Sequence, residues 1–257
     1  MQLIPMATSS IVLTEPASQS TQIIQLFEHL ELFSEGEPAR HTLFVLGRTP
    51  LAQVNPLQTA PDQLLLIDPP ADVRQRFTLE GNVAVLFTGA AQAVGLPQLQ
   101  TVAGGLAHIR IGEHFLDIYT RQQGAVVHLP ALGILCGGSF GSDRALPRLA
   151  ANSTGQEEVE TLRLLARLLK QSRLQLYIPQ VGAVSNSQSE VLMRLAQDVA
   201  YLHNLQRVVP AMVQRGDELA AVLPLADSLL PAERRSPSCR ATHLENLQTM
   251  VEASRRD

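Results

Sequence analysis

The chain has 257 residues, of which 45% are hydrophobic and 17% are charged, and its formal net charge is −4. This balance is typical of a globular protein and excludes global disorder. The basic residues are scattered, and Lys170 is the only lysine among them. We therefore expect no basic surface that would attract nucleic acid or an anionic membrane.

Cysteine usage and the N-terminal segment bear on the compartment. Cys136 and Cys239 are the only cysteines, which is too few for a disulfide framework in a chain of this size. Residues 1–12 lack the basic segment and the sustained apolar run of a signal peptide. No run of about 18 apolar residues could span a bilayer. These features predict a cytoplasmic protein without a membrane span.

Residues 1–40 are polar and rich in turn formers. Within them, the apolar residues between Ser20 and Leu32 recur at helical spacing, which predicts one helix in an N-terminal extension. Downstream, short apolar runs bounded by turn residues predict strands. The predicted strands are Thr42 to Leu46, Gln63 to Ile67, Asn82 to Phe87, His108 to Ile111, Phe115 to Tyr119, Ala125 to Leu129, Gly133 to Cys136 and Leu174 to Ile178.

Two longer helices follow the central strands. The first is predicted from about Gly155 to Gln171, with Thr154 and Glu157 at the spacing of a capping box. The second is predicted from Ser187 to about Val208, with Ser187 and Glu190 in the same relation.

The remaining chain, from Pro210 onward, has the texture of helix interrupted by Pro224, Pro231 and Pro237. We therefore divide the chain into an extension (residues 1–40), a sheet-and-helix domain (41–209) and a helical tail (210–257) that belongs to the same globule.

Four short segments end predicted strands with a recognisable loop. They are Leu66-Ile67-Asp68, Leu86-Phe87-Thr88-Gly89, Leu135-Cys136-Gly137-Gly138-Ser139 and Ile178-Pro179-Gln180-Val181-Gly182. In this order and this strand-loop-helix context, the chain from about His41 to Val208 resembles the metallo-β-lactamase superfamily. The resemblance implies an α+β fold, the four-layer αβ/βα sandwich of that superfamily.

The ligands that the family carries in these loops are replaced, however. Asp68 matches the aspartate of the first motif. The histidines of the second motif fall on Gly89, Ala91 and Val94, and its aspartate falls on Ala93. The third-motif histidine falls on Gln123, the fourth-motif aspartate on Ser139 and the fifth-motif histidine on Val181. We call these eight residues the motif positions.

Zinc or iron in such a site needs three or more imidazole or carboxylate ligands at roughly 2 Å. Apart from Asp68, the motif positions offer no such donor. The seven histidines of the chain form no HxH or HxxxH pair elsewhere. Because these ligands are missing at the positions that the resemblance identifies, we expect no metal cofactor and no metal-activated water. The small and apolar replacements predict that side-chain packing fills the former site.

An enzyme hypothesis remains open. The run Gly137 to Gly141 matches G-x-S-x-G, the nucleophile elbow of serine hydrolases, with Ser139 in the nucleophile position. His203 or His243 could serve as its base, with Asp198 or Asp227 to orient the histidine. The alternative is that this run is an ordinary glycine turn after a strand. The elbow requires a helix after the serine, and no convincing helix follows Ser139. A metal site with unrecognised ligands is the other enzymatic possibility.

The leading prediction is a non-catalytic protein of this fold that acts in binding, as a scaffold or in assembly. A small-molecule binder that uses the old active-site cleft is a further possibility, with Arg121, Gln122 and Gln123 in its lining. The helical tail could dock a protein partner, and a homodimer is the default expectation for such a domain.

Overall fold

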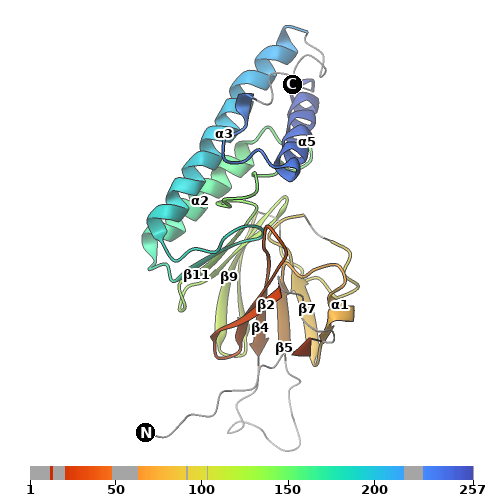
Figure 1. Cartoon of the computed structure of the whole chain (residues 1–257), viewed down its shortest axis with the longest axis vertical. Helices are drawn as coiled ribbons and strands as arrows, with labels where there is room; N and C mark the ends of the chain where they lie inside the picture. The colour runs from red at the N-terminus through yellow and green to blue at the C-terminus, as the bar shows by residue number, and fades with distance from the viewer. Residues whose placement is uncertain are drawn as a thin grey trace, which may run out of the picture.

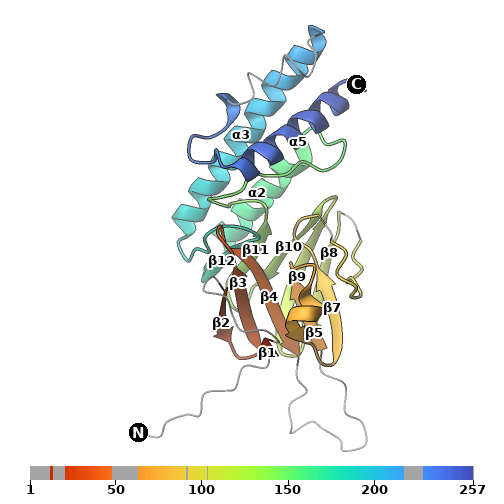
Figure 2. The ribbon, with the colours of Figure 1, turned by 45° about the vertical axis from the view of Figure 1, so that its right-hand side comes forward.

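The computed structural model of the chain describes residues 12–13, 21–47, 63–90, 92–102, 104–216 and 228–256. Two five-stranded sheets lie face to face and form one half of the molecule (Figure 2). The three long helices extend beyond one end of these sheets and form the other half (Figure 1). All eight predicted strands are present, and their ends differ from the predicted ends by at most two residues.

The first sheet has the order β2-β3-β4-β5-β7. All its neighbours are antiparallel except β5 and β7, which run parallel. Its strands are β2 (Thr21–Phe27), β3 (Leu30–Glu35), β4 (Arg40–Gly47), β5 (Gln63–Ile67) and β7 (Asn82–Leu86).

The helix predicted over Ser20 to Leu32 is wrong, because these residues form the β2–β3 hairpin. Their apolar spacing is compatible with either structure, and the β-branched Thr21, Ile23 and Ile24 favour a strand. The hairpin turn places His29 in the left-handed region, at φ +60°. Since β3 pairs with β4, the sheet crosses the predicted boundary at residue 40.

The second sheet has the order β12-β11-β10-β9-β8, and only the β11–β12 pair is parallel. The predicted hairpins around Gly112 and around Pro130 to Leu132 are both confirmed. Its strands are β8 (Leu106–Ile111), β9 (His114–Arg121), β10 (Gly124–Leu129), β11 (Ile134–Gly138) and β12 (Leu176–Pro179).

Alternation along the strands divides the core into layers. In β4, Leu43 and Val45 face the second sheet, while Phe44 between them belongs to the cluster on the outer face of the first sheet. In β10, Val127 likewise faces the first sheet, and Val126 faces the helices. Each strand therefore contributes to two apolar layers, as expected when both faces of a sheet are covered.

The outer face of the second sheet shares one apolar cluster with helices α2 (Gln156–Gln171), α3 (Gln188–Gln214) and α5 (Pro237–Ser254). Helix α3 contacts both of the others. The outer face of the first sheet is covered by the short α1 (Val73–Arg76), and β6 (Phe77–Thr78) follows it and pairs with β1 (Val12–Leu13). Phe77 packs edge-on against Phe33 and Phe44. The result is the expected α+β four-layer sandwich, with one helical layer reduced to a single turn.

The predicted cap of α2 is wrong. Its N-cap is Gly155, at φ +84°, and Thr154 makes no capping bond. Glu158, one residue beyond the predicted Glu157, closes the turn instead. Its carboxylate accepts hydrogen bonds from Ser153 Oγ at 2.6 Å and from the backbone N–H of Ala150 at 2.7 Å. The left-handed glycine shifts the helix start by one residue, and Glu158 instead of Glu157 therefore bonds to the residues that precede the helix.

The predicted cap of α3 is confirmed, since Ser187 Oγ accepts a hydrogen bond from the backbone N–H of Glu190. The helix continues through Pro210, however, to Gln214. The predicted boundary at residue 209 therefore falls inside a helix. Pro231 and Pro237 precede and begin α5 as expected of helix breakers, whereas Pro224 lies outside the described residues.

Among the described residues, no helix is both long and apolar enough to cross a membrane.

Leu205 of α3 is fully buried among the helices and the second sheet. We expect Leu205→Ala to lower the free energy of unfolding by about 2–5 kcal/mol, because it removes buried methyl groups and leaves a cavity. Met193→Ala on the same helix is the control. Met193 is 57% exposed, so its truncation should cost no more than about 0.5 kcal/mol. Equal losses in chemical denaturation would contradict this packing of α3.

Candidate functional site

A cavity of about 970 Å³ opens between the loops at one end of both sheets and the start of α5. We call it the loop pocket. Its wall comes from the β3–β4 turn, the loop after β7, the β9–β10 turn, the loops after β11 and β12, and the first turns of α2 and α5. The expectation that packing fills the former site is therefore wrong, because the loops leave a space large enough for a small molecule.

The structure brings four of the eight motif positions together in the wall of this pocket, namely Gly89, Gln123, Ser139 and Val181. Asp68 is hydrogen-bonded to two further wall residues, Thr88 and Gln180.

The rest of the second motif does not join the wall. Val94 is buried in the cluster on the outer face of the first sheet. Ala93 is exposed and does not line the pocket. Ala91 lies outside the described residues.

Asp68 ties three loops together. Its carboxylate accepts a hydrogen bond from the Thr88 backbone N–H at 2.8 Å, a second from the Thr88 hydroxyl, and a third from Gln180 Nε2 at 3.3 Å. Burial raises the pKa of Asp68 to about 6, although these donors favour the charged form. The carboxylate is therefore occupied in holding the loops that follow β7 and β12.

Gln180 occupies the space that a histidine at position 89 would need. A Cβ atom added to Gly89 would lie 3.1 Å from Gln180 Oε1. The Gln180 backbone N–H donates to Gly138 O at 2.8 Å, which fixes the glutamine at the end of the second sheet. A side chain at position 89 would therefore require the Gln180 amide to shift.

The loop after β12 is held from both sides. His41 Nε2 donates to the Gly182 carbonyl at 2.6 Å, and Ser142 Oγ donates to the Val181 carbonyl at 2.6 Å. Burial lowers the pKa of His41, which favours the neutral ring. Gly182 lies at φ +109°, and a Cβ there would fall 2.3 Å from Asp143 Oδ1. Only glycine fits this approach.

The residues of the pocket do not fit a zinc or iron site. Glycine and valine at positions 89 and 181 carry no donor, and Gln123 and Ser139 are weak neutral ligands. Across the described ranges, no three histidine, cysteine, aspartate or glutamate side chains gather where they could hold a metal ion. The residues at these positions therefore supply too few side-chain donors for such a metal site.

The serine-hydrolase geometry is not assembled. Ser139 lines the pocket and accepts a hydrogen bond from the Arg148 backbone N–H at 3.5 Å, and within the described part of the chain no histidine is bonded to it. His243 bonds to Tyr201, and His203 is exposed. No helix begins directly after the glycine loop, since residues 142–155 are irregular, whereas the nucleophile elbow requires one there. Asp227 lies outside the described residues.

Gln123, at the third-motif position, supports the wall. Its amide nitrogen faces the carbonyls of Arg148 and Leu149, at 3.2 and 3.3 Å, once the amide is oriented to match these acceptors. It therefore joins the β9–β10 turn to the loop after β11. Of the polar residues predicted to line a cleft, Arg121 and Gln123 do so and Gln122 does not.

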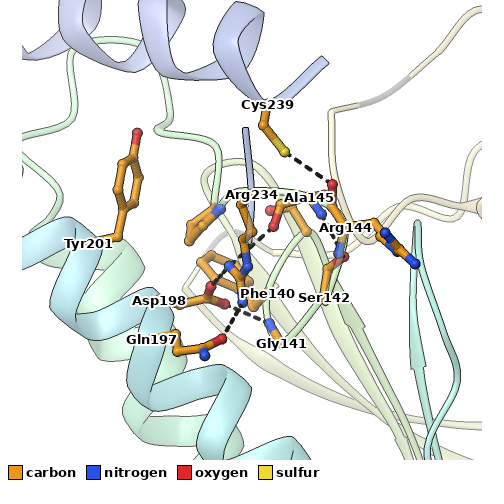
Figure 3. A network of polar contacts seen from close by, with 12 residues as sticks. Phe140, Gly141, Ser142, Arg144, Ala145, Gln197, Asp198, Tyr201, Arg234 and Cys239 are labelled. Atoms are coloured by element: carbon orange, nitrogen blue, oxygen red, sulfur yellow. Dashed lines mark hydrogen bonds and ion pairs between the residues drawn. The ribbon is translucent and has the colours of Figure 1, made fainter. Parts of the chain in front are cut away.

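A buried ion pair joins the helical layer to this loop. Asp198 of α3 and Arg234, just before α5, have side chains 0% and 1% exposed. Figure 3 shows their contact, with Arg234 also donating to Ala145 O and Gln197 Oε1, both at 3.2 Å. Asp198 accepts the Gly141 backbone N–H at 2.7 Å. Asp198 is therefore a structural residue, not the orienting member of a triad.

Sequence reasoning missed Arg234, and of the pocket arginines it identified only Arg121. Arg40, Arg76, Arg144 and Arg148 line the loop pocket together with Arg121. They come from segments far apart in the chain and form no local pattern, so only the fold identifies them as neighbours.

No protein-family model matches the chain, and a search of curated proteins finds no match. Solved structures do match. One is the inverting sec-alkylsulfatase Pisa1 from Pseudomonas sp., with a TM-score of 0.59 and 9% identity over 90% of this chain and 50% of that one. Another is a β-lactamase domain protein from Burkholderia ambifaria, with a TM-score of 0.54 and 11% identity over 93% and 89% of the two chains. The chain therefore spans about half the length of the alkylsulfatase.

These likenesses, together with the two sheets and their outer layers, show that the chain has the metallo-β-lactamase fold. At this level of identity they show the fold alone. The chemistry of the site has to be argued from its own residues.

Asp68→Asn should change how stability depends on pH. A raised folded-state pKa means that the folded protein binds a proton more tightly than the unfolded chain. The contribution of Asp68 to stability should therefore be greatest below the unfolded value of 3.8 and fall as the pH rises to about 6. The shift corresponds to about 3 kcal/mol. Asparagine does not titrate, so the variant should lack this fall.

Denaturation at several pH values between about 4 and 7 would measure the effect, with Glu80→Gln as a control at an exposed carboxylate. Parallel curves for wild type and Asp68→Asn would contradict the assignment of Asp68 as a buried, desolvated carboxyl.

Arg234→Met should lower the free energy of unfolding by about 3–5 kcal/mol, because it leaves the buried Asp198 carboxylate without its partner. The double variant Asp198→Asn, Arg234→Met should recover part of this loss, since no charge remains buried. Arg235→Met changes the adjacent exposed arginine and should cost about 0.5 kcal/mol or less. If urea denaturation showed similar losses for the two arginine variants, the ion pair would not have the structural role given to it here.

Proposed function

We propose that this chain is a non-catalytic binding protein built on the metallo-β-lactamase fold, and that the loop pocket is its binding site. The observation that carries the proposal is that a cavity of about 970 Å³ persists where the motif positions no longer supply metal ligands. The pocket wall combines apolar side chains with many polar and charged ones, so it can both bury and orient a small molecule.

The hydrogen bonds around the pocket support a binding role. Asp68, Gln123 and Gln180 all use their side chains to hold the surrounding loops. A wall fixed in this way is preorganised, so little ordering entropy is lost when a ligand enters. The same residues are thereby removed from acid–base or nucleophilic roles.

The proposal also covers the cellular compartment and the partners of the protein. Both cysteines are buried free thiols, in keeping with a reducing cytoplasm. We propose that the protein works there as a homodimer or with a protein partner, and that ligand binding in the loop pocket is what such an assembly would respond to. The exposed surface of α5, which begins in the pocket wall, is the route by which a partner would sense the ligand.

The decisive experiment combines metal analysis with an activity panel. Protein expressed in medium supplemented with zinc and iron should contain neither metal in stoichiometric amount. It should also leave ester, thioester, lactam and phosphodiester substrates unchanged. Ser139→Ala should behave as wild type does, and a fluorophosphonate probe should label neither. Bound metal together with turnover, or labelling that Ser139→Ala abolishes, would establish a hydrolase instead.

A further inference from the structure

Arg121 lies in the wall of the loop pocket and has a buried side-chain nitrogen without a protein partner in the described part of the chain. It ends β9, and its Nε is buried without a hydrogen-bond partner among the described residues. A buried donor left unpaired is costly, and such groups in native proteins commonly mark the place of a missing partner.

The other pocket arginines are mostly paired. Arg76 contacts Glu35 and Asp72, Arg144 lies 3.4 Å from Asp143, and Arg148 lies 3.1 Å from Glu245. Within the described ranges, Arg121 and Arg40 form no ion pair with the protein's own carboxylates, and of the two only Arg121 also has a buried orphan nitrogen.

The acidic residues of the pocket are largely engaged as well. Glu35 is paired with Arg76, and Glu158 accepts from Ala150 and Ser153. Glu157 accepts the Gln122 backbone N–H at 2.8 Å. Glu37, in the β3–β4 turn, is exposed. Glu157 is therefore the wall carboxylate whose charge opposes an anion near Arg121, and its backbone bond holds it in place.

Ser139 supplies a second donor. Its oxygen accepts a long hydrogen bond from the Arg148 N–H, and in the part of the chain described here its own O–H has no acceptor. The same wall also contains apolar residues, among them Val126, Phe140 and Leu146. A guanidinium and a hydroxyl beside hydrocarbon match a ligand with an anionic head and an apolar body.

We propose that the loop pocket binds an organic anion whose carboxylate, phosphate or sulfate group is held by Arg121 and Ser139, with its apolar portion against Val126, Phe140 and Leu146. This inference rests on the proposed binding function and specifies its ligand class. The guanidinium fork suits all three head groups, since each presents two oxygens to it.

The test is isothermal titration calorimetry of the intact protein with hexanoate, hexyl phosphate and hexyl sulfate. The matched probes 1-hexanol and hexyltrimethylammonium have the same chain without a negative charge. At least one anion should bind, and both matched probes should bind at least about tenfold more weakly, as expected for loss of a charge-assisted hydrogen bond. The comparison among the three anions identifies the head group.

Variants locate the head group. Arg121→Met should weaken anion binding at least about tenfold, and Arg121→Lys should retain part of the affinity because it keeps the charge. Ser139→Ala should weaken binding less. Glu157→Gln should strengthen it, since it removes the opposing charge and keeps an acceptor for Gln122. Arg163→Met, at an exposed position of α2 outside the pocket, should leave binding unchanged. Circular dichroism and melting temperature would confirm that each variant folds.

If 1-hexanol bound as tightly as the anions, the anion assignment would be wrong while the binding function stood. Binding by none of the probes, or anion binding that Arg121→Met and Arg121→Lys both left intact, would also overturn it. Failure of the proposed function is a separate result, seen as metal content and turnover in the experiment described above.

Discussion

The buried pair of Asp198 and Arg234 is the interaction on which the rest of the structure depends. It connects α3, the glycine loop after β11 and the segment that leads into α5, and it does so with two side chains almost fully removed from water. Such a pair is costly to desolvate, and burial raises the pKa of Asp198 to about 6 despite the opposing charge of Arg234. The cost is offset by the charge pairing and by the hydrogen bonds that Arg234 gives to Ala145 O and Gln197 Oε1 and that Asp198 accepts from Gly141. The pair therefore fixes where the start of α5 meets the sheets, and thus where one wall of the loop pocket stands.

Asp68 holds a different part of the pocket wall, the loops that follow β7 and β12. In the metallo-β-lactamase fold the loops after the strands present the functional groups, and here the same loops bond to one another. The Gln180 amide donates to Asp68 and lies next to Gly89, and the Thr88 backbone N–H donates to the same carboxylate. Backbone and side-chain hydrogen bonds hold these loops in place around the pocket. A rigid wall around an open space is suited to binding. The side-chain donors that make no hydrogen bond within the described part of the protein, on Arg121 and Ser139, then select the ligand.

The local parts of the structure were predictable to different degrees. Strands such as Gln63–Ile67 were found to the residue, because a short apolar run between turn residues is encoded by its own sequence. The β2–β3 hairpin was missed because its apolar spacing also suits a helix, and pairing with β4 decides between the two. The α2 cap was missed because a left-handed Gly155 moves the helix start by one residue, a backbone choice that the Thr154–Glu157 pattern does not reveal.

The amino-acid sequence by itself determined eight of the strands, the loops that end four of them, and the absence of histidine at the motif positions, since residue identity and short-range periodicity are properties of the chain alone. Only the tertiary structure decided that the site remains open, that Gln180 lies over Gly89, and that Arg121 keeps an unpaired nitrogen in the wall. These features depend on atoms brought together from distant segments, such as the 112 positions that separate Asp68 from Gln180. No local pattern records such a contact, because its free energy arises only when the sheets and helices have packed.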